Sequence, residues 1–194
     1  LIHAVSRARK RQRFLNKHPE NSLRIRLLKK IFPDARFIHL IRDGRAVVFS
    51  NYAQTLRDPH RMLFPFGWFP KPPGWRNHRD LPWLDQFAHQ WVGVVENIRE
   101  CLADVVPERD RVEIRYEDFC DAPRETLRRL DEFCGFDNDL RQTAVTGKLE
   151  ASNGKWRTDI PPEDMARIAP IISPLLAELG YEDAASEKIK QVSS

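Results

Sequence analysis

The segment FPDARFIHLIRDGRAVVFS, Phe32 to Ser50, constrains the fold more than any other part of this chain. Its residues Phe37 to Ile41 form a short apolar run with β-branched members, which is typical of a buried strand in a parallel sheet. The residues that follow, as far as about Leu56, can wind as a helix, with Asp43 at its N-cap. The sequence therefore predicts a strand, a tight turn and a helix, in that order.

Charged residues occupy this turn, which reads Arg42, Asp43, Gly44 and Arg45. Open α/β folds bind ligands at the carboxyl ends of their strands, where such a turn lies. Free N–H groups at a helix start favour an anion, and guanidinium groups add bidentate donors for phosphate or sulfate. An ion pair between Arg42 and a nearby carboxylate is the alternative. Ser50 favours the anion site, because it follows Arg42 by eight residues and can face the same ligand.

The same string, FPDARFI followed by RDGRA and a serine, resembles the 3′-phosphate-binding segment of the sulfotransferase family. That family transfers a sulfuryl group from 3′-phosphoadenosine 5′-phosphosulfate (PAPS). The resemblance implies that Arg42 and Ser50 hold the 3′-phosphate of this donor. Asn16-Lys17-His18-Pro19 ahead of a helix is similar to the tyrosylprotein sulfotransferases and their bacterial relatives, which implies that Lys17 lies at the reacting sulfuryl group.

Two later segments carry the same resemblance. Tyr116 ends a predicted strand that begins at Arg111, and its place in the family pattern implies a contact with the adenine; a half-buried strand tyrosine is the alternative. Glu117 and Asp118, which follow it, are interpreted as turn and capping residues. The polar stretch Thr146 to Thr158 corresponds to a family loop that closes over the 3′-phosphate, which implies Lys155 and Arg157 as further donor ligands.

Apolar periodicity predicts the remaining helices, at residues 85–103 and 123–134 and from the Pro161-Pro162 pair to Gly180. A further helix, capped by Asn21 or Ser22, is predicted ahead of the strand, and its apolar face would carry Leu23, Leu27, Leu28 and Ile31. Lys17 would then lie at a strand-to-helix junction, on the same sheet edge as Arg42 if the strands are parallel neighbours.

Together with the resemblance, these elements predict an α/β protein of the three-layer P-loop NTPase-like fold, with a central, mostly parallel sheet flanked by helices. One sulfotransferase domain is expected over residues 1–194, with a polar tail at 182–194. Residues 58–84, rich in proline and aromatic residues, are expected to form a lid loop that shapes the acceptor pocket, or else a packed surface loop. The sequence contains no (P)xxxSGTT phosphosulfate loop, so we expect the first strand and P-loop of the family to be missing.

Sulfuryl transfer needs cations at the donor phosphates, a cation at the transferred group and a base for the acceptor hydroxyl. The phosphate ligands named above serve the first need and Lys17 the second. His18 is the candidate base, with Glu20 as an equal alternative. No metal is expected, and the product of the donor would be 3′,5′-adenosine bisphosphate. The acceptor hydroxyl would belong to a peptide tyrosine, a carbohydrate or a small metabolite.

Composition narrows the partners. The net charge of +4 is mild, and the basic run Arg7 to Arg13 lacks interleaved aromatic residues, so no nucleic-acid partner is expected. No apolar run is long enough to span a membrane. Three cysteines without CxxC spacing predict free thiols and favour the cytoplasm over a lumenal compartment. A homodimer stays open.

Three other functions compete with this prediction. The first is a catalytically inactive nucleotide-binding or interaction domain that retains the 3′-phosphate half-site. A P-loop kinase is disfavoured, because the sequence shows no Mg²⁺-binding aspartate after a hydrophobic strand and ATP has no 3′-phosphate for Arg42 and Ser50 to bind. A basic nucleic-acid-binding protein is the most distant of the three.

Overall fold

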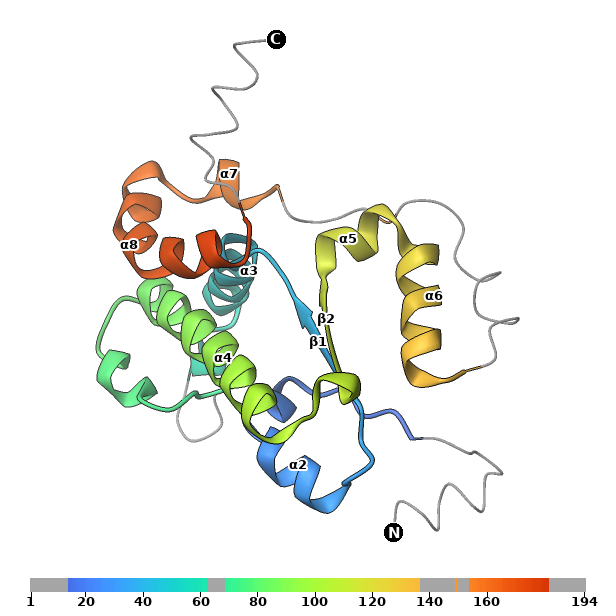
Figure 1. Ribbon diagram of the computed structural model, residues 1–194. Helices are drawn as coiled ribbons and strands as arrows, with labels where there is room; N and C mark the ends of the chain where they lie inside the picture. Colours follow the sequence, from blue (N-terminus) through green and yellow to red (C-terminus); the bar gives the residue numbers. More distant parts are fainter. Residues whose placement is uncertain (1–13, 63–68, 137–148, 150–153, 182–194) are drawn as a thin grey trace.

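Two parallel strands form the centre of the molecule. The computed structural model describes residues 14–62, 69–136, 149 and 154–181. Strand β1 (Phe37–Ile41) pairs in parallel with β2 (Arg111–Arg115), and the register runs from the pair Phe37–Arg111 to the pair Ile41–Arg115. In Figure 1 the two strands run side by side through the middle of the fold. Both carboxyl ends therefore meet at one edge of the sheet.

Helices flank this strand pair on two sides (Figure 1). One side holds α3 (Gly44–Arg57), α4 (Trp83–Val105) and α8 (Pro162–Glu178), and the other holds α5 (Tyr116–Asp121) and α6 (Pro123–Cys134). The shorter elements are η1 (Pro19–Leu23), α2 (Ile25–Ile31), η2 (Pro59–Met62), η3 (Trp75–His78), η4 (Glu108–Asp110) and α7 (Trp156–Asp159). The predicted α/β fold class is confirmed.

The main core lies where α3, α4 and α8 meet. Helix α4 repeats apolar residues at three- and four-residue steps, so one stripe of it faces inward. Phe87 and Trp91 from this stripe pack with Val48 of α3 and Ile172 of α8 in one buried cluster. Trp91 is therefore a core residue. Val48 and its neighbours thus hold α3 against α4 and α8.

Helix α6 has the predicted bounds. Pro123 opens it, where its missing N–H costs no intrahelical bond. Gly135 ends it in the left-handed conformation with φ of 66°, which side chains other than glycine rarely adopt. The predicted range 123–134 is therefore confirmed.

The prediction that β1 is buried on both faces is wrong for the described part of the fold. Ile41 is 3% exposed, whereas Leu40 is 55% exposed, and the burial of the strand alternates along its length. Alternation of this kind belongs to a strand with one covered face. The predicted apolar face before it fails in the same way, because Leu27 and Ile31 of α2 are exposed and Ile25 is the buried residue of that helix.

The chain before η1 also differs from the prediction. Residues 14–18 have no strand, so Lys17 does not lie at a strand-to-helix junction in the described residues. The predicted single helix from Asn21 or Ser22 is split into η1 and α2 at Arg24. The basic run at residues 7–13 and the predicted tail at 182–194 lie outside the described residues.

The segment expected to act as a lid is packed against α4 where it is described. It contains η2 and η3, and its last two residues, from Trp83 on, already belong to α4. The Gln90 side chain donates a hydrogen bond of 2.6 Å to the carbonyl of Pro70. Gly93 allows close approach here, because a Cβ atom on it would lie 3.0 Å from Cγ of Pro72. This packing agrees with the alternative of a packed surface loop, although the sequence did not indicate α4 as its partner.

Candidate functional site

The candidate site lies where both strands end. Ile41 and Arg115 form the last pair of the ladder, and the next residues on each strand continue the contact through side chains. The Arg42 guanidinium carbon lies 4.8 Å from the ring centroid of Tyr116, and the Asp43 amide donates a hydrogen bond of 3.1 Å to the Glu117 carboxylate. The sheet edge thus brings together Arg42 and Tyr116, two of the residues predicted to bind the donor.

Asp43 organises the turn after β1. Its carboxylate accepts from the Arg45 amide at 2.9 Å, so the predicted N-cap of α3 is confirmed. The same carboxylate receives Nε and Nη2 of Arg45 at 3.0 and 2.9 Å. Arg45 is only 6% exposed, and its guanidinium carbon lies 4.4 Å from the ring centroid of Trp156. Arg45 therefore stabilises the turn, and the interpretation that both arginines of this turn face a ligand is wrong for Arg45.

Gly44 is required by close packing. A Cβ atom at this position would lie 2.7 Å from ring atoms of Trp91, well inside the range of real contacts. The first residue of α3 can therefore rest directly on the indole of α4. This contact places the start of α3, and with it the turn, against the main core.

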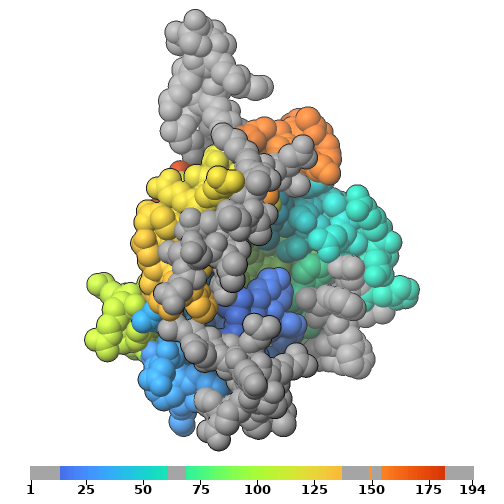
Figure 2. Space-filling view, turned by 90° about the vertical axis from the view of Figure 1, so that its right-hand side faces the viewer, coloured from blue at the N-terminus to red at the C-terminus, as the bar shows by residue number. Residues whose placement is uncertain are grey.

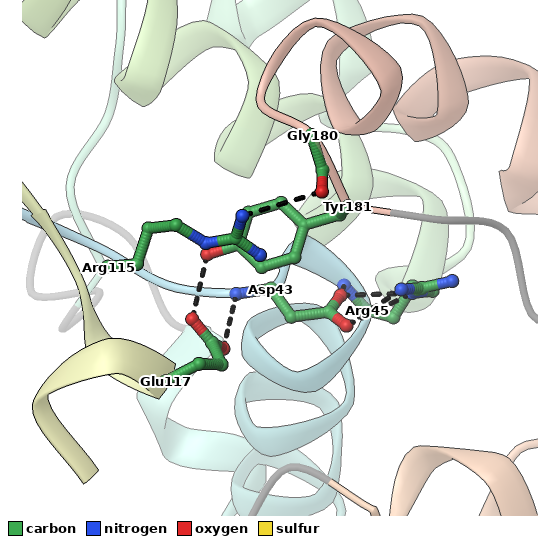
Figure 3. A network of polar contacts seen from close by, with 6 residues as sticks. All are labelled: Asp43, Arg45, Arg115, Glu117, Gly180 and Tyr181. Atoms are coloured by element: carbon green, nitrogen blue, oxygen red, sulfur yellow. Dashed lines mark hydrogen bonds and ion pairs between the residues drawn. The ribbon is translucent and has the colours of Figure 1, made fainter. Parts of the chain in front are cut away.

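A carboxylate links three segments beside this turn (Figure 3). Glu117 accepts from the Asp43 amide with one oxygen and from the Tyr181 hydroxyl with the other, at 2.9 Å. The Arg115 guanidinium lies across the Tyr181 ring, with its carbon 4.2 Å from the centroid, and donates to the carbonyl of Gly180. Burial, and next the bond to Glu117, raises the pKa of Tyr181, so its hydroxyl remains a donor. The sequence indicated a turn or capping role for Glu117 and no role for Tyr181.

The adenine-side candidate, Tyr116, lies one residue beyond β2, at the first position of α5. The predicted strand end at this residue is therefore one residue too late. A hydrogen bond with the Cys120 side chain, together with burial, raises the pKa of the Tyr116 hydroxyl. One side of the ring receives the guanidinium of Arg42, as described above.

The C-terminal candidates lie around Trp156. Lys155 and Arg157 are exposed, and the Arg157 guanidinium carbon lies 4.6 Å from the centroid of the buried Trp156 ring, on which Arg45 also rests. The described end of the predicted polar loop leads into α7, a single helical turn that begins at Trp156. Residues 146–148 and 150–153 of that loop lie outside the described residues.

Ser50 lies two turns along α3 and is partly exposed. Its hydroxyl accepts a hydrogen bond of 3.3 Å from the Gln54 side chain. This bond leaves the hydroxyl proton of Ser50 to donate elsewhere, because a hydroxyl both donates and accepts. As the sequence predicted, Ser50 lies on the helix that follows the turn of Arg42.

Lys17 and His18 lie on a separate, exposed segment. Nδ1 of His18 accepts from the Glu20 amide at 3.3 Å, so His18 caps η1. A hydrogen bond of 3.1 Å from the Asn97 side chain to the carbonyl of Ser22 ties η1 to α4. Figure 2 shows this part of the chain in dark blue, on the face that also carries α5 and α6 in yellow to orange.

Two buried donors near the turn have no hydrogen-bond partner among the described residues: Nε of Arg115, whose guanidinium lies on the Tyr181 ring, and Nε1 of Trp156, whose ring lies under Arg45. The partly exposed guanidinium of Arg42 at the same edge suits a phosphate, because its planar donors match phosphate oxygens. Among the described ranges, no three His, Cys, Asp or Glu side chains are placed to hold a metal ion.

A cavity of about 280 Å³ lies between the residues 69–78 and α4. Phe69 and Phe87 meet edge to face at 4.8 Å in its wall, and three prolines and Trp75 add apolar surface. The rings of His78 and His89 stack at 3.7 Å with an angle of 7°. Burial, and then the neighbouring His78, lowers the pKa of His89, so its imidazole is neutral at pH 7.

The comparisons with known proteins agree on one family. The profile described as "Sulfotransferase family" matches residues 1–139. Over 127 residues, or 66% of the chain, the sequence is 32% identical to the omega-hydroxy-beta-dihydromenaquinone-9 sulfotransferase Stf3 of Mycobacterium tuberculosis and of Mycobacterium bovis, of whose length it covers 30%. It is 26% identical to protein-tyrosine sulfotransferase A of Caenorhabditis elegans, over 90% of the chain and 46% of that protein.

A solved structure confirms the fold. The sulfotransferase domain from the curacin biosynthetic pathway matches 93% of this chain and 67% of its own length, with a TM-score of 0.60 and 18% identity. The chain thus spans less than half the length of the mycobacterial and nematode relatives named above. No helix in the described part of the chain is long and apolar enough to cross a membrane.

Proposed function

The chain belongs to the sulfotransferase family, and on that premise we propose that it carries the donor-binding part of an enzyme that moves a sulfuryl group from PAPS to a hydroxyl acceptor. The observation that carries this proposal is the contact between Arg42 and Tyr116 where β1 and β2 both end. A guanidinium and an aromatic ring at the carboxyl edge of parallel strands suit a phosphate and a base of one nucleotide.

Each donor contact has a proposed residue. Arg42 and Ser50 bind the 3′-phosphate, the first through its planar donors and the second through its hydroxyl proton. Tyr116 lies against the adenine. Lys155, which precedes α7, and Arg157 within it are both exposed, and they close over the same phosphate. The reaction uses positioned cations and no metal, and it releases 3′,5′-adenosine bisphosphate.

The transfer step is assigned to the exposed segment before η1. The Lys17 ammonium stabilises the charge that develops on the sulfuryl oxygens and the bridging oxygen. His18 takes the proton of the acceptor hydroxyl through Nε2, because Nδ1 already accepts from the Glu20 amide. Glu20 is the alternative base. As the acceptor oxygen bonds to sulfur, the bond from sulfur to the bisphosphate oxygen breaks, and its electron pair leaves with the bisphosphate.

The cavity beside α4 is proposed to hold the acceptor. Gln90 of α4 connects the cavity to the proposed donor site. It lines the cavity, and its Oε1 accepts a hydrogen bond of 3.5 Å from Nδ2 of Asn51, the residue after Ser50 on α3. The proline and aromatic walls of the cavity favour a peptide tyrosine or an apolar metabolite over a carbohydrate. The neutral imidazole of His89 can accept a hydrogen bond from a hydroxyl.

Calorimetric titration of this chain with 3′,5′-adenosine bisphosphate, and with 5′-AMP as control, tests the donor site. The two ligands differ only in the 3′-phosphate. We expect the bisphosphate to bind at least tenfold more tightly, because one charged contact contributes about 1.5–3 kcal/mol. Equal affinity for the two nucleotides would reject the proposed function.

Ligand-observed NMR with N-acetyltyrosinamide and methyl glucoside tests the acceptor cavity. We expect signal transfer to the tyrosine derivative alone. His89→Leu should abolish it, whereas His60→Leu, the same change at an exposed residue that does not line the cavity, should not. Equal signals in both variants would assign the binding to another surface.

The competing function is a domain that binds the nucleotide without catalysis. It is favoured by the exposure of Lys17 and His18, which contrasts with the dense contacts of the turn. A full-length protein that binds the bisphosphate but transfers no sulfuryl group to any hydroxyl acceptor would support it. The possible homodimer and the cytoplasmic location remain predictions from the sequence.

A further inference from the structure

The Tyr181 hydroxyl and the Glu117 carboxylate form a clamp on the backbone that carries Arg42, and we propose that this pair positions Arg42 for the 3′-phosphate. The inference rests on the proposed function and concerns residues outside the predicted donor contacts. Neither residue is assigned a contact with the nucleotide. Both act through the peptide between Arg42 and Asp43 (Figure 3).

The first step of the argument is the register of the strands. The ladder ends at the pair Ile41–Arg115, so continuing it sets Arg42 opposite Tyr116 and Asp43 opposite Glu117. Both of these further pairs are in contact, the first through a guanidinium on a ring and the second through the Asp43 amide. The direction in which Arg42 leaves the backbone is therefore set by Tyr116 and Glu117, the two residues that follow β2.

The second step is the position of the carboxylate. Glu117 is partly buried and uses separate oxygens for the Asp43 amide and the Tyr181 hydroxyl. Without the hydroxyl, that oxygen would lose one donor, and the carboxylate would be held less firmly against the amide. A charged hydrogen bond of this kind is short and directional, so its loss affects geometry as well as energy.

The third step is the anchor of Tyr181 itself. Its ring is buried in the main core cluster, and the Arg115 guanidinium covers one face of it. Arg115 also donates to the carbonyl of Gly180, whose φ of 72° lets the chain turn after α8. The hydroxyl is thus held in place by contacts that do not involve Glu117. It can act as a fixed reference point for the turn.

The fourth step is that the other half of the turn is fixed independently. The Asp43 side chain is occupied by Arg45, and Arg45 is packed on Trp156. The clamp therefore acts on the amide side of Asp43, where Arg42 begins, and the pair with Arg45 acts on the helix side. Removal of the Tyr181 hydroxyl should disturb Arg42 while α3 keeps its cap.

The test is Tyr181→Phe, which removes one oxygen atom and retains the ring. The matched control is Tyr52→Phe, since Tyr52 packs against the same core cluster from α3. The readouts are the affinities for 3′,5′-adenosine bisphosphate and 5′-AMP and the melting temperature. We expect Tyr181→Phe to weaken the bisphosphate roughly three- to tenfold, the range for one hydrogen bond, and to leave 5′-AMP unchanged. Tyr52→Phe should change neither affinity.

A double-mutant cycle with Glu117→Gln adds a second criterion. Because both residues act through one carboxylate, the double variant should be no worse than Glu117→Gln alone in its selectivity for the bisphosphate. Unchanged selectivity in Tyr181→Phe, or equal loss of both nucleotides, would overturn the positioning role. A parent chain that does not prefer the bisphosphate would instead reject the proposed function.

Discussion

The turn at residues 42–45 and the segment at residues 14–18 are held in different ways. The turn is fixed by Asp43, Arg45, Glu117 and Trp91, through hydrogen bonds and through the contact of a glycine with an indole. The segment is exposed throughout, and its described hydrogen bonds are local ones at His18, which accepts from the Glu20 amide at Nδ1 and from the Asn21 amide at its carbonyl. Both regions carry residues for which the sequence predicts a role in the same reaction.

The difference indicates a division of labour. A phosphate site benefits from groups that are already in place, because their ordering cost is met by folding. The segment of Lys17 has no such support among the described residues, so its geometry depends on what binds beside it. Binding and transfer should therefore respond differently to substitution, and four measurements examine this difference.

Arg42→Ala should produce the largest effect. Loss of a guanidinium contact to a phosphate removes about 1.5–3 kcal/mol, or roughly ten- to a hundredfold in affinity for 3′,5′-adenosine bisphosphate. The melting temperature should change little, because Arg42 rests on the surface of the ring of Tyr116. Titration calorimetry measures the first quantity and thermal unfolding the second. An unchanged dissociation constant would remove Arg42 from the donor site.

Gly44→Ala should destabilise the fold by about 1–3 kcal/mol, the usual cost of an added methyl group in a packed core. The new Cβ would lie 2.7 Å from the Trp91 ring, and neither partner can easily move. Chemical denaturation measures the change. Gly154→Ala is the control, because a Cβ atom there meets nothing within 4 Å. Equal stability of the two variants would show that the contact under the turn is looser than described.

Low pH should lower the stability of the fold through Glu113 of β2, by less than Gly44→Ala does. A hydrogen bond with His39, whose ring nitrogen lies 2.9 Å from the carboxylate, lowers the pKa of Glu113. A depressed pKa contributes stability above the ordinary value of about 4.3, and this contribution is lost as the pH falls through the folded value. Glu113→Gln should therefore narrow the stability difference between pH 6 and pH 3. An identical pH profile in the variant would contradict this.

Lys17→Ala should have the smallest effect on binding and stability. The side chain is exposed, so we expect the melting temperature and the bisphosphate affinity to stay within error of the parent. Turnover of PAPS by the full-length protein should fall strongly, and Lys17→Arg should restore part of it by returning the charge. A large loss of stability in Lys17→Ala would erase the contrast between the two regions.

Local patterns predicted the regular elements well. The strand Phe37–Ile41, the helix Pro123–Cys134 and the glycine stop at Gly135 lie where the sequence placed them. The signals for these are contained within a few neighbouring residues: an apolar run, a proline at a helix start and a glycine after its end. The family resemblance gave Arg42 and Tyr116 separate roles at the donor, and the structure places the two side chains in contact at one edge of the sheet.

The contacts that shape the site could not be predicted in this way. Glu117 meets Asp43 across 74 residues and Tyr181 across 64, so nothing near any of them in the sequence reports the pairing. Arg45 was misjudged for the same reason, since its partner Trp156 comes from α7. The exposed side of β1 was missed because an apolar run does not show which of its faces is covered.

The hydroxyl of Tyr181 closes the last of these long-range links, and this has a consequence for the order of events in the cell. During synthesis, both strands and α6 are made well before Tyr181, the residue that completes the clamp with Glu117. Parallel pairing across such separations is slow to form, since loop closure must precede it. The nucleotide site should therefore mature only after synthesis has passed residue 181. A chain that ends one turn before the end of α8 would keep much of its core but would lack Tyr181 and with it the clamp.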